Sequence, residues 1–158
     1  MHPHLRVAHS APLSAVGTAE VRGAGNYLGA LIARVMTFPR PGSGVPVELV
    51  VRETPTGTVW ERRFGGDRVR TVQRAIGGYM VEHRGPGRLW FSVSVTDGAV
   101  VYESVCASVF GVALPRSMTP RVTGRVSPAE DGWQTQVEVS APLLGLLCAY
   151  SVRMRAKP

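Results

Sequence analysis

Hydrophobic and polar residues alternate with a period of two along most of the chain after Val45. The stretch RLWFSVSVTDG, residues 88–98, has the most regular alternation, and its closing Asp97-Gly98 pair is typical of a hairpin turn. Alternation of this kind, in short segments bounded by glycine or proline, predicts strands with one buried face. We therefore expect about nine antiparallel strands at nearly regular spacing.

One stretch departs from this pattern. In GNYLGALIARVMTF, residues 25–38, apolar side chains recur at the period of a helix, namely Leu28, Leu31, Ile32 and Val35. The spacing predicts a helix over 25–38 that ends before Pro39, because proline cannot continue a helix. We expect its apolar face to pack on a broad surface, such as one face or the mouth of a sheet.

So many consecutive antiparallel strands curl towards closure. We predict a mainly all-β fold, an antiparallel up-and-down β-barrel or deep curved cup of about nine strands, with the short helix acting as a lid. A β-sandwich with a filled core is the alternative. A Rossmann unit does not fit, since no strand–helix–strand alternation occurs, and neither does a helix-grip fold, which needs a long C-terminal helix.

The length of the chain sets its domain organisation. The 158 residues fit one domain, 1–158, and leave too few for two ordinary ones. We expect residues 1–14 to form a flexible N-terminal segment.

The basic balance of the chain does not indicate a nucleic-acid partner. The formal net charge is +7, and of the 18 basic residues only Lys157 is a lysine, a bias typical of high-GC coding as in actinobacteria. The arginines are scattered as singles and pairs beside acidic residues, whereas nucleic-acid-binding domains gather positive charge in a stripe or tail. We expect a solvated basic surface and no nucleic-acid partner.

No cofactor or metal motif stands out. Cys106 and Cys148 form no CxxC pair, so we expect two buried free thiols, or a bridge only if neighbouring strands bring them together. His2, His4 and His9 are not expected to form a defined metal site, because they lie on the terminal segment. We expect no metal and no cofactor.

The chain also lacks a recognisable targeting or membrane segment. Its first residues contain no continuous apolar run of the kind found in signal peptides. The longest apolar stretch, 27–35, is far shorter than the ~20 residues of a membrane span. We expect a cytoplasmic protein with no membrane span, and a homodimer is one assembly that the sequence allows.

The first candidate site residues share a strand face. Trp60, Arg62 and Phe64 alternate in TVWERRFG, so all three are expected to point inward. A buried guanidinium needs a carboxylate, and Glu82 is the nearest candidate, one or two strands away. Arg62 and Glu82 are therefore either a structural ion pair or a catalytic or ligand-anchoring pair. If they form a buried ion pair, removal of Glu82 is expected to cost about 3–5 kcal/mol.

Further candidates lie on other strands. Glu103 shares a face with apolar residues of VVYESVCASVF, which predicts a desolvated carboxyl suited to general acid catalysis, unless a bulge exposes that face. Tyr102 and Tyr150 are candidate ligand-binding residues that place hydroxyls in a pocket, with simple packing in the β domain as the alternative. His83 titrates near neutral pH in principle, but alternation puts it on the face opposite to Glu82, in solvent.

Several stretches together resemble the domain of unknown function 4166, a bacterial domain often fused behind a saccharopine-dehydrogenase-like Rossmann domain. They are VPVELVV, WERRFGG, EHRGP, GVALPRSMTPR and SAPLLGLLCAY. The resemblance covers residues 27–150 and implies a β-rich domain, expected here to be free-standing. The matching positions are Trp60, Arg62, Phe64, Gly65, Gly66, Glu82, Gly85, Pro86, Leu114, Pro115, Pro120, Gly145 and Tyr150. The chain departs from the family pattern at His83-Arg84 and at Val126.

Three functions remain open from the sequence. The first is a barrel that binds a small apolar metabolite, carrying or acting on it in a bacterial, secondary-metabolic pathway, with Arg62 and Tyr150 fixing a polar end. The second is a cofactor-independent cyclase or isomerase acting on a polyketide-like substrate, with Arg62, Glu82 and Glu103 as catalytic residues. The third is a non-catalytic interaction domain with a filled core.

Overall fold

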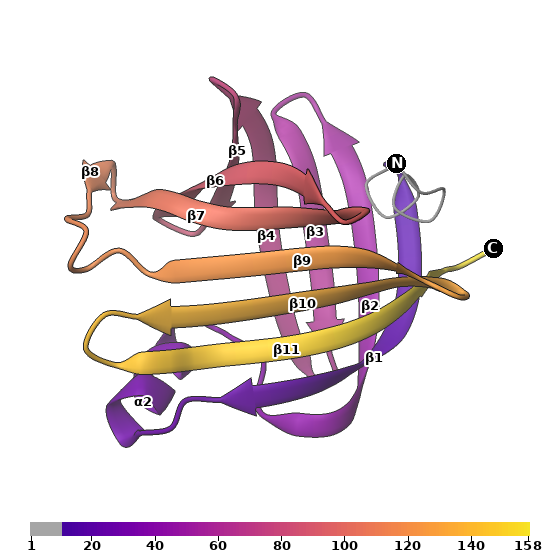
Figure 1. Cartoon of the computed structure of the whole chain (residues 1–158), viewed down its shortest axis with the longest axis horizontal. Helices are drawn as coiled ribbons and strands as arrows, with labels where there is room; N and C mark the ends of the chain where they lie inside the picture. Colours follow the sequence, from indigo (N-terminus) through magenta and orange to yellow (C-terminus); the bar gives the residue numbers. More distant parts are fainter. Residues whose placement is uncertain (1–10) are drawn as a thin grey trace.

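The computed structural model describes residues 11–158, and in this part of the chain eleven strands and one helix occur (Figure 1). The strands are β1 (Leu13–Gly23), β2 (Gly42–Thr54), β3 (Gly57–Phe64), β4 (Asp67–Ile76), β5 (Tyr79–Arg84), β6 (Gly87–Thr96), β7 (Ala99–Val109), β8 (Val112–Ala113), β9 (Arg121–Ala129), β10 (Gly132–Ala141) and β11 (Gly145–Ala156). The helix is α2 (Tyr27–Val35), between β1 and β2. No helix in residues 11–158 is long and apolar enough to cross a membrane.

Ten of the strands close into an antiparallel barrel. Each strand pairs with its neighbours in sequence, β7 pairs with β6 and β9, and β11 pairs back with β1. The two-residue β8 is a short addition on β7 and is the only strand of the described residues outside the ring. The all-β fold and the antiparallel barrel are thus confirmed. The ring has ten strands against about nine expected, and β8 was missed because two residues carry no alternation.

The alternation seen in the sequence separates the inside of the barrel from the outside. Val47, Leu49 and Val51 are all buried, while the intervening Glu48 is exposed. The inward side chains of β1, β2, β10 and β11 form the main hydrophobic core, with Trp133 among them. Each fully buried side chain of this kind contributes about 1.5–3 kcal/mol to folding relative to an exposed one.

Small residues line the seam where the first and last strands of the barrel meet. Along β1 the inward positions next to β11 are Ala15, Gly17 and Ala19. A Cβ atom at Gly17 would overlap the backbone carbonyl oxygen of Arg153 on β11. Glycine is therefore needed here for close approach of two backbones, and not for an unusual backbone angle.

The N-terminal part of the chain is described only from residue 11. Leu13 and Ser14, within the segment expected to be flexible, already pair with Val51 and Val50 of β2. The remainder of that segment, residues 1–10 with the three histidines, lies outside the described residues. Cys106 and Cys148 are both free thiols, but only Cys148 is buried, so the expected burial is wrong for Cys106, which is exposed.

Helix α2 is shorter than expected and is oriented differently. It begins after Asn26, whose side chain accepts a hydrogen bond from the Gly29 amide at 2.7 Å. Side-chain capping of this type stabilises a helix N-terminus. The expected burial of its apolar face is wrong, because Leu28, Leu31 and Val35 are 54%, 47% and 74% exposed. Only Gly29 of the helix is buried.

Two contacts hold α2 at one end of the barrel. The Asn26 side-chain amide donates a hydrogen bond to the Leu144 carbonyl oxygen in the β10–β11 turn, at 2.9 Å. Beyond the helix, Arg84 of β5 donates to the carbonyl and hydroxyl oxygens of Thr37 and lies over the ring of Phe38. These polar contacts, with few buried side chains, fix the position of the helix.

A substitution at the seam tests its tight packing. Gly17→Ala is expected to lower the free energy of unfolding by about 1–3 kcal/mol, because the added methyl group forces β1 and β11 apart. Urea unfolding followed by circular dichroism measures this change. The matched control is Gly66→Ala, a turn position with no heavy atom within 4 Å of an added Cβ. Equal unfolding midpoints for the two variants would contradict the proposed role of Gly17.

Candidate functional site

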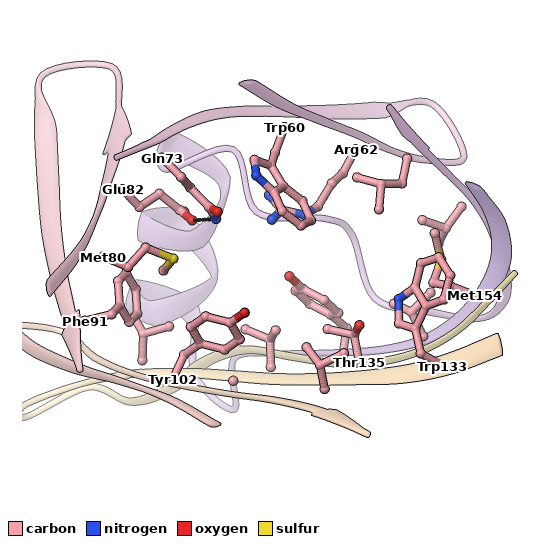
Figure 2. A pocket seen from close by; sticks show the side chains of 18 of the residues that line it. Trp60, Arg62, Gln73, Met80, Glu82, Phe91, Tyr102, Trp133, Thr135 and Met154 are labelled. Carbon is pink, nitrogen blue, oxygen red and sulfur yellow. Dashed lines mark hydrogen bonds between the residues drawn. The ribbon is translucent and has the colours of Figure 1, made fainter. Parts of the chain in front are cut away.

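The inner faces of the barrel walls line a cavity of about 150 Å³ that is partly open to solvent. One wall consists mainly of β3, β4 and β5, and the facing wall of β7, β9, β10 and β11 (Figure 2). Met80 and Phe91 lie at one end of the cavity, and Trp133 and Met154 at the other. The lining is mostly apolar. Its charged and hydrogen-bonding side chains include Arg62, Gln73, Glu82, Tyr102, Thr135 and Tyr150.

Six of the seven predicted site residues line this one cavity. They are Trp60, Arg62, Phe64, Glu82, Tyr102 and Tyr150. Alternation along β3, β5, β7 and β11 turns each of these side chains inward, which is why strand pattern alone places them together. Gln73, Met80, Thr135 and Trp133 were not selected from the sequence. The sequence pattern could have identified Gln73, because it shares the inner face of β4 with Val69 and Thr71, which are buried.

Glu103 lies elsewhere. Its side chain is exposed, and it does not line the cavity, so the expectation of a desolvated carboxyl is not met. The physical reason is the inward position of Tyr102, which turns its neighbour outward. A bulge between Trp90 and Phe91 in the β6–β7 pairing also leaves Val105 exposed. The apolar stripe that Glu103 shares therefore faces solvent at this point, as in the bulge alternative.

Arg62 is held without a carboxylate. Its Nη1 donates a hydrogen bond to the hydroxyl of the buried Thr71 at 3.2 Å. Its guanidinium carbon lies 5.1 Å from the ring centroid of Trp60. A cation over an indole ring contributes roughly 0.5–2 kcal/mol, depending on how far it is desolvated. Among the described residues Arg62 makes no ion pair.

The register of the sheet explains why Arg62 and Glu82 do not pair. Glu82 lies opposite Gln73, which in turn lies opposite Thr58, four positions from Arg62 along β3. Four residues of strand correspond to about 13 Å. Both side chains line the same cavity, but Glu82 instead accepts a hydrogen bond from the Gln73 amide at 2.9 Å.

Arg84 is the second cation at this side of the barrel. Burial lowers the pKa of its guanidinium, and the negative charge of Glu82 opposes that shift. Its hydrogen bonds to the Thr37 oxygens, at 2.7 and 2.9 Å, direct it towards α2. Glu82 is therefore near a cation, though that cation is Arg84 and not the expected Arg62.

The two tyrosines remain protonated. Burial raises the pKa of Tyr102 to about 12, with the charge of Arg62 acting in the opposite direction. Burial also raises the pKa of Tyr150, whose ring packs edge-on against Phe64 with 5.1 Å between centroids. Neutral phenols donate hydrogen bonds, so these side chains suit the recognition of an acceptor better than proton abstraction.

Trp60 contributes a donor that is left without a partner. Its indole Nε1 is buried and makes no hydrogen bond. An unsatisfied buried donor costs about 1–3 kcal/mol, and such groups in native proteins call for an explanation such as a bound molecule. Because Trp60 lines the cavity, a ligand there is one partner that would satisfy it.

His83 faces away from the cavity, on the side of β5 opposite to Glu82. It is half-buried, however, and not fully in solvent as expected, and its Nε2 is buried without a hydrogen-bond partner. Burial lowers the pKa of His83, and the charges of Arg88 and Arg74 lower it further. The imidazole is therefore neutral near pH 7 and is removed from the cavity chemistry.

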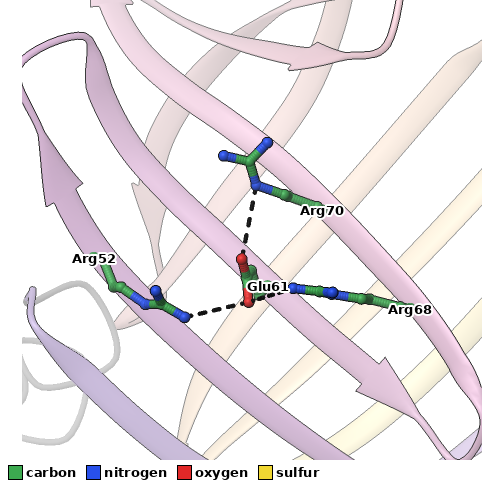
Figure 3. Close-up of polar contacts among 4 residues, drawn as sticks. All are labelled: Arg52, Glu61, Arg68 and Arg70. Carbon is green, nitrogen blue, oxygen red and sulfur yellow. Dashed lines mark hydrogen bonds and ion pairs between the residues drawn. The ribbon is translucent and has the colours of Figure 1, made fainter.

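The outer face of the same wall carries a charge cluster. Glu61 accepts from Arg68 at 3.0 Å and pairs with Arg52 and Arg70 at 3.4 and 3.7 Å (Figure 3). The hydrogen bond from Arg68 is the largest cause that lowers the pKa of Glu61. The cluster agrees with the sequence-based interpretation that the arginines are interleaved with acidic residues.

Substitution of Glu82 distinguishes a buried ion pair from the contacts described above. Glu82→Gln is expected to lower the free energy of unfolding by about 1 kcal/mol, because the new amide still accepts a hydrogen bond from Gln73. Arg62 keeps its bond to Thr71. Chemical denaturation measures the change, with the exposed Glu103→Gln as control. A loss of about 3–5 kcal/mol would instead show that a buried positive charge depends on Glu82.

The cluster around Glu61 predicts a pH dependence. A carboxyl whose pKa is lower in the folded state contributes stability above its unfolded pKa, and that stability is lost as the pH falls through the folded pKa. Glu61→Gln should therefore flatten the loss of stability in acid, below about pH 4.5. At pH 7 and low salt the variant should lose less than about 1 kcal/mol of unfolding free energy, because water weakens the attraction within exposed ion pairs.

Thermal unfolding between pH 7 and pH 3 measures this effect, with the exposed Glu138→Gln as control at neutral pH. An unchanged acid limb in the Glu61 variant would contradict the assignment.

No group of three or more metal-ligating side chains that could hold an ion occurs in the described part of the chain.

No curated protein and no solved structure matches the chain. A family model does match, that of a domain of unknown function (DUF4166), over residues 1–154. This match covers nearly all of the 158 residues and includes every residue of the cavity lining. The chain therefore belongs to the DUF4166 family.

Proposed function

We propose that the barrel binds a small ligand with an apolar body and an anionic, hydrogen-bond-accepting end such as a carboxylate. The observation that carries this proposal is a buried donor without a hydrogen-bond partner near a cation without a carboxylate partner, both on β3. The buried Trp60 Nε1 has no hydrogen-bond partner, and the neighbouring Arg62 has no carboxylate partner among the described residues. Both line the cavity, and an oxygen-bearing anion satisfies both.

The other polar groups of the cavity support the same ligand chemistry. Arg62 is close enough to Tyr150 for its charge to oppose the rise of the tyrosine pKa. A protonated Tyr150 beside a guanidinium provides a second donor for an acceptor atom. The rest of the lining, including Phe91, Trp133 and Met154, offers apolar surface to the body of the ligand.

The volume limits the size of the ligand. A cavity of about 150 Å³ corresponds to the space that holds a single benzene ring in an engineered protein cavity. Pockets for drug-sized ligands are usually about 300–1,000 Å³. One ring or a short aliphatic chain therefore fits without rearrangement. A polyketide-like substrate is larger than this volume, so the cyclase or isomerase alternative has no specific support. The presence of a cavity weighs against a filled-core interaction domain.

Ligand binding can be tested by titration with small carboxylates. Hexanoate and benzoate are compared with hexanol and benzyl alcohol, which have the same apolar body and no charge. Trp60 and Trp133 both line the cavity, so quenching of tryptophan fluorescence reports binding, and calorimetry gives the affinity. We expect the carboxylates to bind more tightly than the alcohols.

The role of Arg62 has a matched control on the same strand. Arg62→Gln should weaken carboxylate binding about tenfold to hundredfold, since a hydrogen bond to a charged group contributes about 1.5–3 kcal/mol. Alcohol binding should change little. Arg63→Gln removes the same charge from the exposed neighbouring position and should leave both affinities unchanged. No saturable binding of any probe, or equal losses in the two variants, would contradict the proposal.

A further inference from the structure

The connections between strands divide into two sets, one at each end of the barrel. Because the strands run up and down in sequence, alternate connections lie at the same end. One end, here named the α2 end, carries residues 24–41, 65–66, 85–86, 110–120 and 142–144. Figure 1 shows α2, β8 and the β10–β11 turn together at this end, on the left of the view. The opposite end carries the turns at 55–56, 77–78, 97–98 and 130–131.

The two ends differ in charge. The five connections of the α2 end contain Arg34, Arg40 and Arg116, and they contain no aspartate or glutamate. Arg40 is paired with Asp67 at 3.1 Å, which leaves the charges of Arg34 and Arg116 without an ion-pair partner in the described part of the chain. The four turns of the opposite end have the reverse composition, with Asp97, Glu130, Asp131 and no basic residue.

Large apolar side chains are exposed across the α2 end. Six of them, from three separate connections, are between 64% and 104% exposed: Tyr27, Val35, Phe110, Val112, Met118 and Leu143. They are named here the apolar rim. A monomeric protein rarely exposes so many large apolar side chains together unless the surface meets another phase or molecule. The rim therefore identifies a binding surface.

Two residues of the rim also adopt an unfavourable backbone conformation. Phe110 and Leu143 have φ angles of 50° and 69°, in the left-handed region. Glycine, asparagine and aspartate enter this region at lower cost than bulky apolar residues do. Phe110 is 82% exposed and Leu143 is fully exposed. Burial in the barrel therefore does not compensate for the conformational cost at either residue. Folding alone does not explain these two residue types.

We propose that the α2 end docks on the surface of a lipid bilayer that contains anionic lipid. The apolar rim would enter the interfacial region of the bilayer, while Arg34 and Arg116 face the negative headgroups. The five connections contain no acidic residue, and Asp67, which begins β4 at this end, is paired with Arg40, so little negative charge opposes such a surface. Side chains projecting from three separate connections around a barrel end suit contact with an extended surface.

Vesicle binding tests this proposal with the whole chain. Protein is sedimented with vesicles of phosphatidylcholine alone and with vesicles in which a quarter of the lipid is phosphatidylglycerol, at low and at high salt. We expect binding to the anionic vesicles, weakened by salt, and much weaker binding to phosphatidylcholine. Arg116→Gln should lower the affinity for anionic vesicles about fivefold, the effect expected for one basic side chain near the surface.

The left-handed positions provide the sharpest variants. The double substitution Phe110→Asn and Leu143→Asn should lower vesicle affinity at least tenfold, because two apolar side chains no longer enter the bilayer. It should leave the melting temperature unchanged or raised, because asparagine tolerates the left-handed region. Destabilisation therefore cannot mimic the predicted loss of binding. The matched control is Ile76→Asn, which removes a 50% exposed apolar side chain at the opposite end and should leave binding unchanged.

Two results would overturn the proposal. One is the absence of binding to anionic vesicles, or binding that the double substitution does not weaken. The other is a concentration-dependent dimer in sedimentation velocity that the double substitution dissociates, without vesicle binding by the unsubstituted chain. That outcome would assign the apolar rim to a second copy of the chain.

Discussion

Pairing between the first and last strands of the barrel is the constraint on which the rest of the structure depends. Nine residue pairs join β1 to β11, from Ala15–Ala156 to Gly23–Cys148. Without this seam the sheet would have two exposed edges and its inner face would open to water. Glycine is needed at position 17 because a larger side chain would meet the β11 backbone at Arg153, and the flanking inward residues Ala15 and Ala19 are also small. Closure thus determines composition at the seam.

The number of strands then explains why an interior space exists. A barrel of about eight strands is just wide enough for its own side chains to fill, and width grows with strand number. A ring of ten strands needs large side chains to span it, and Phe64, Trp60 and Trp133 project inward for this purpose. They do so incompletely, which leaves the cavity between the walls. The same inward alternation that builds the core brings Arg62 and Glu82 into it.

Strand alternation predicted more of the fold than of the site. Side chains alternate between the two faces of a strand, so the alternation in the sequence predicted that Trp60, Arg62 and Glu82 point into the barrel. Alternation does not determine the stagger between strands. This stagger separates Arg62 from Glu82 and places Gln73 where its amide donates a hydrogen bond to Glu82. A bulge cannot be read from period either, so Glu103 remained ambiguous in sequence. The helical period of α2 located the helix, but an apolar helix face does not specify whether sheet, solvent or another surface covers it.

Several features of the molecule lower its folding stability, and no interaction within the folded chain compensates for them. The Trp60 donor is unsatisfied, and Phe110 and Leu143 combine exposure with left-handed backbone. Each costs on the order of 1 kcal/mol or more, against a total stability of only about 5–15 kcal/mol for a domain. They are also not scattered: one group lines the cavity and the other rims the α2 end. Departures from local consistency that cluster in this way mark functional surfaces, because interactions outside the folded chain are what compensate them. The cavity and the apolar rim are therefore two parts of the molecule that folding alone does not account for.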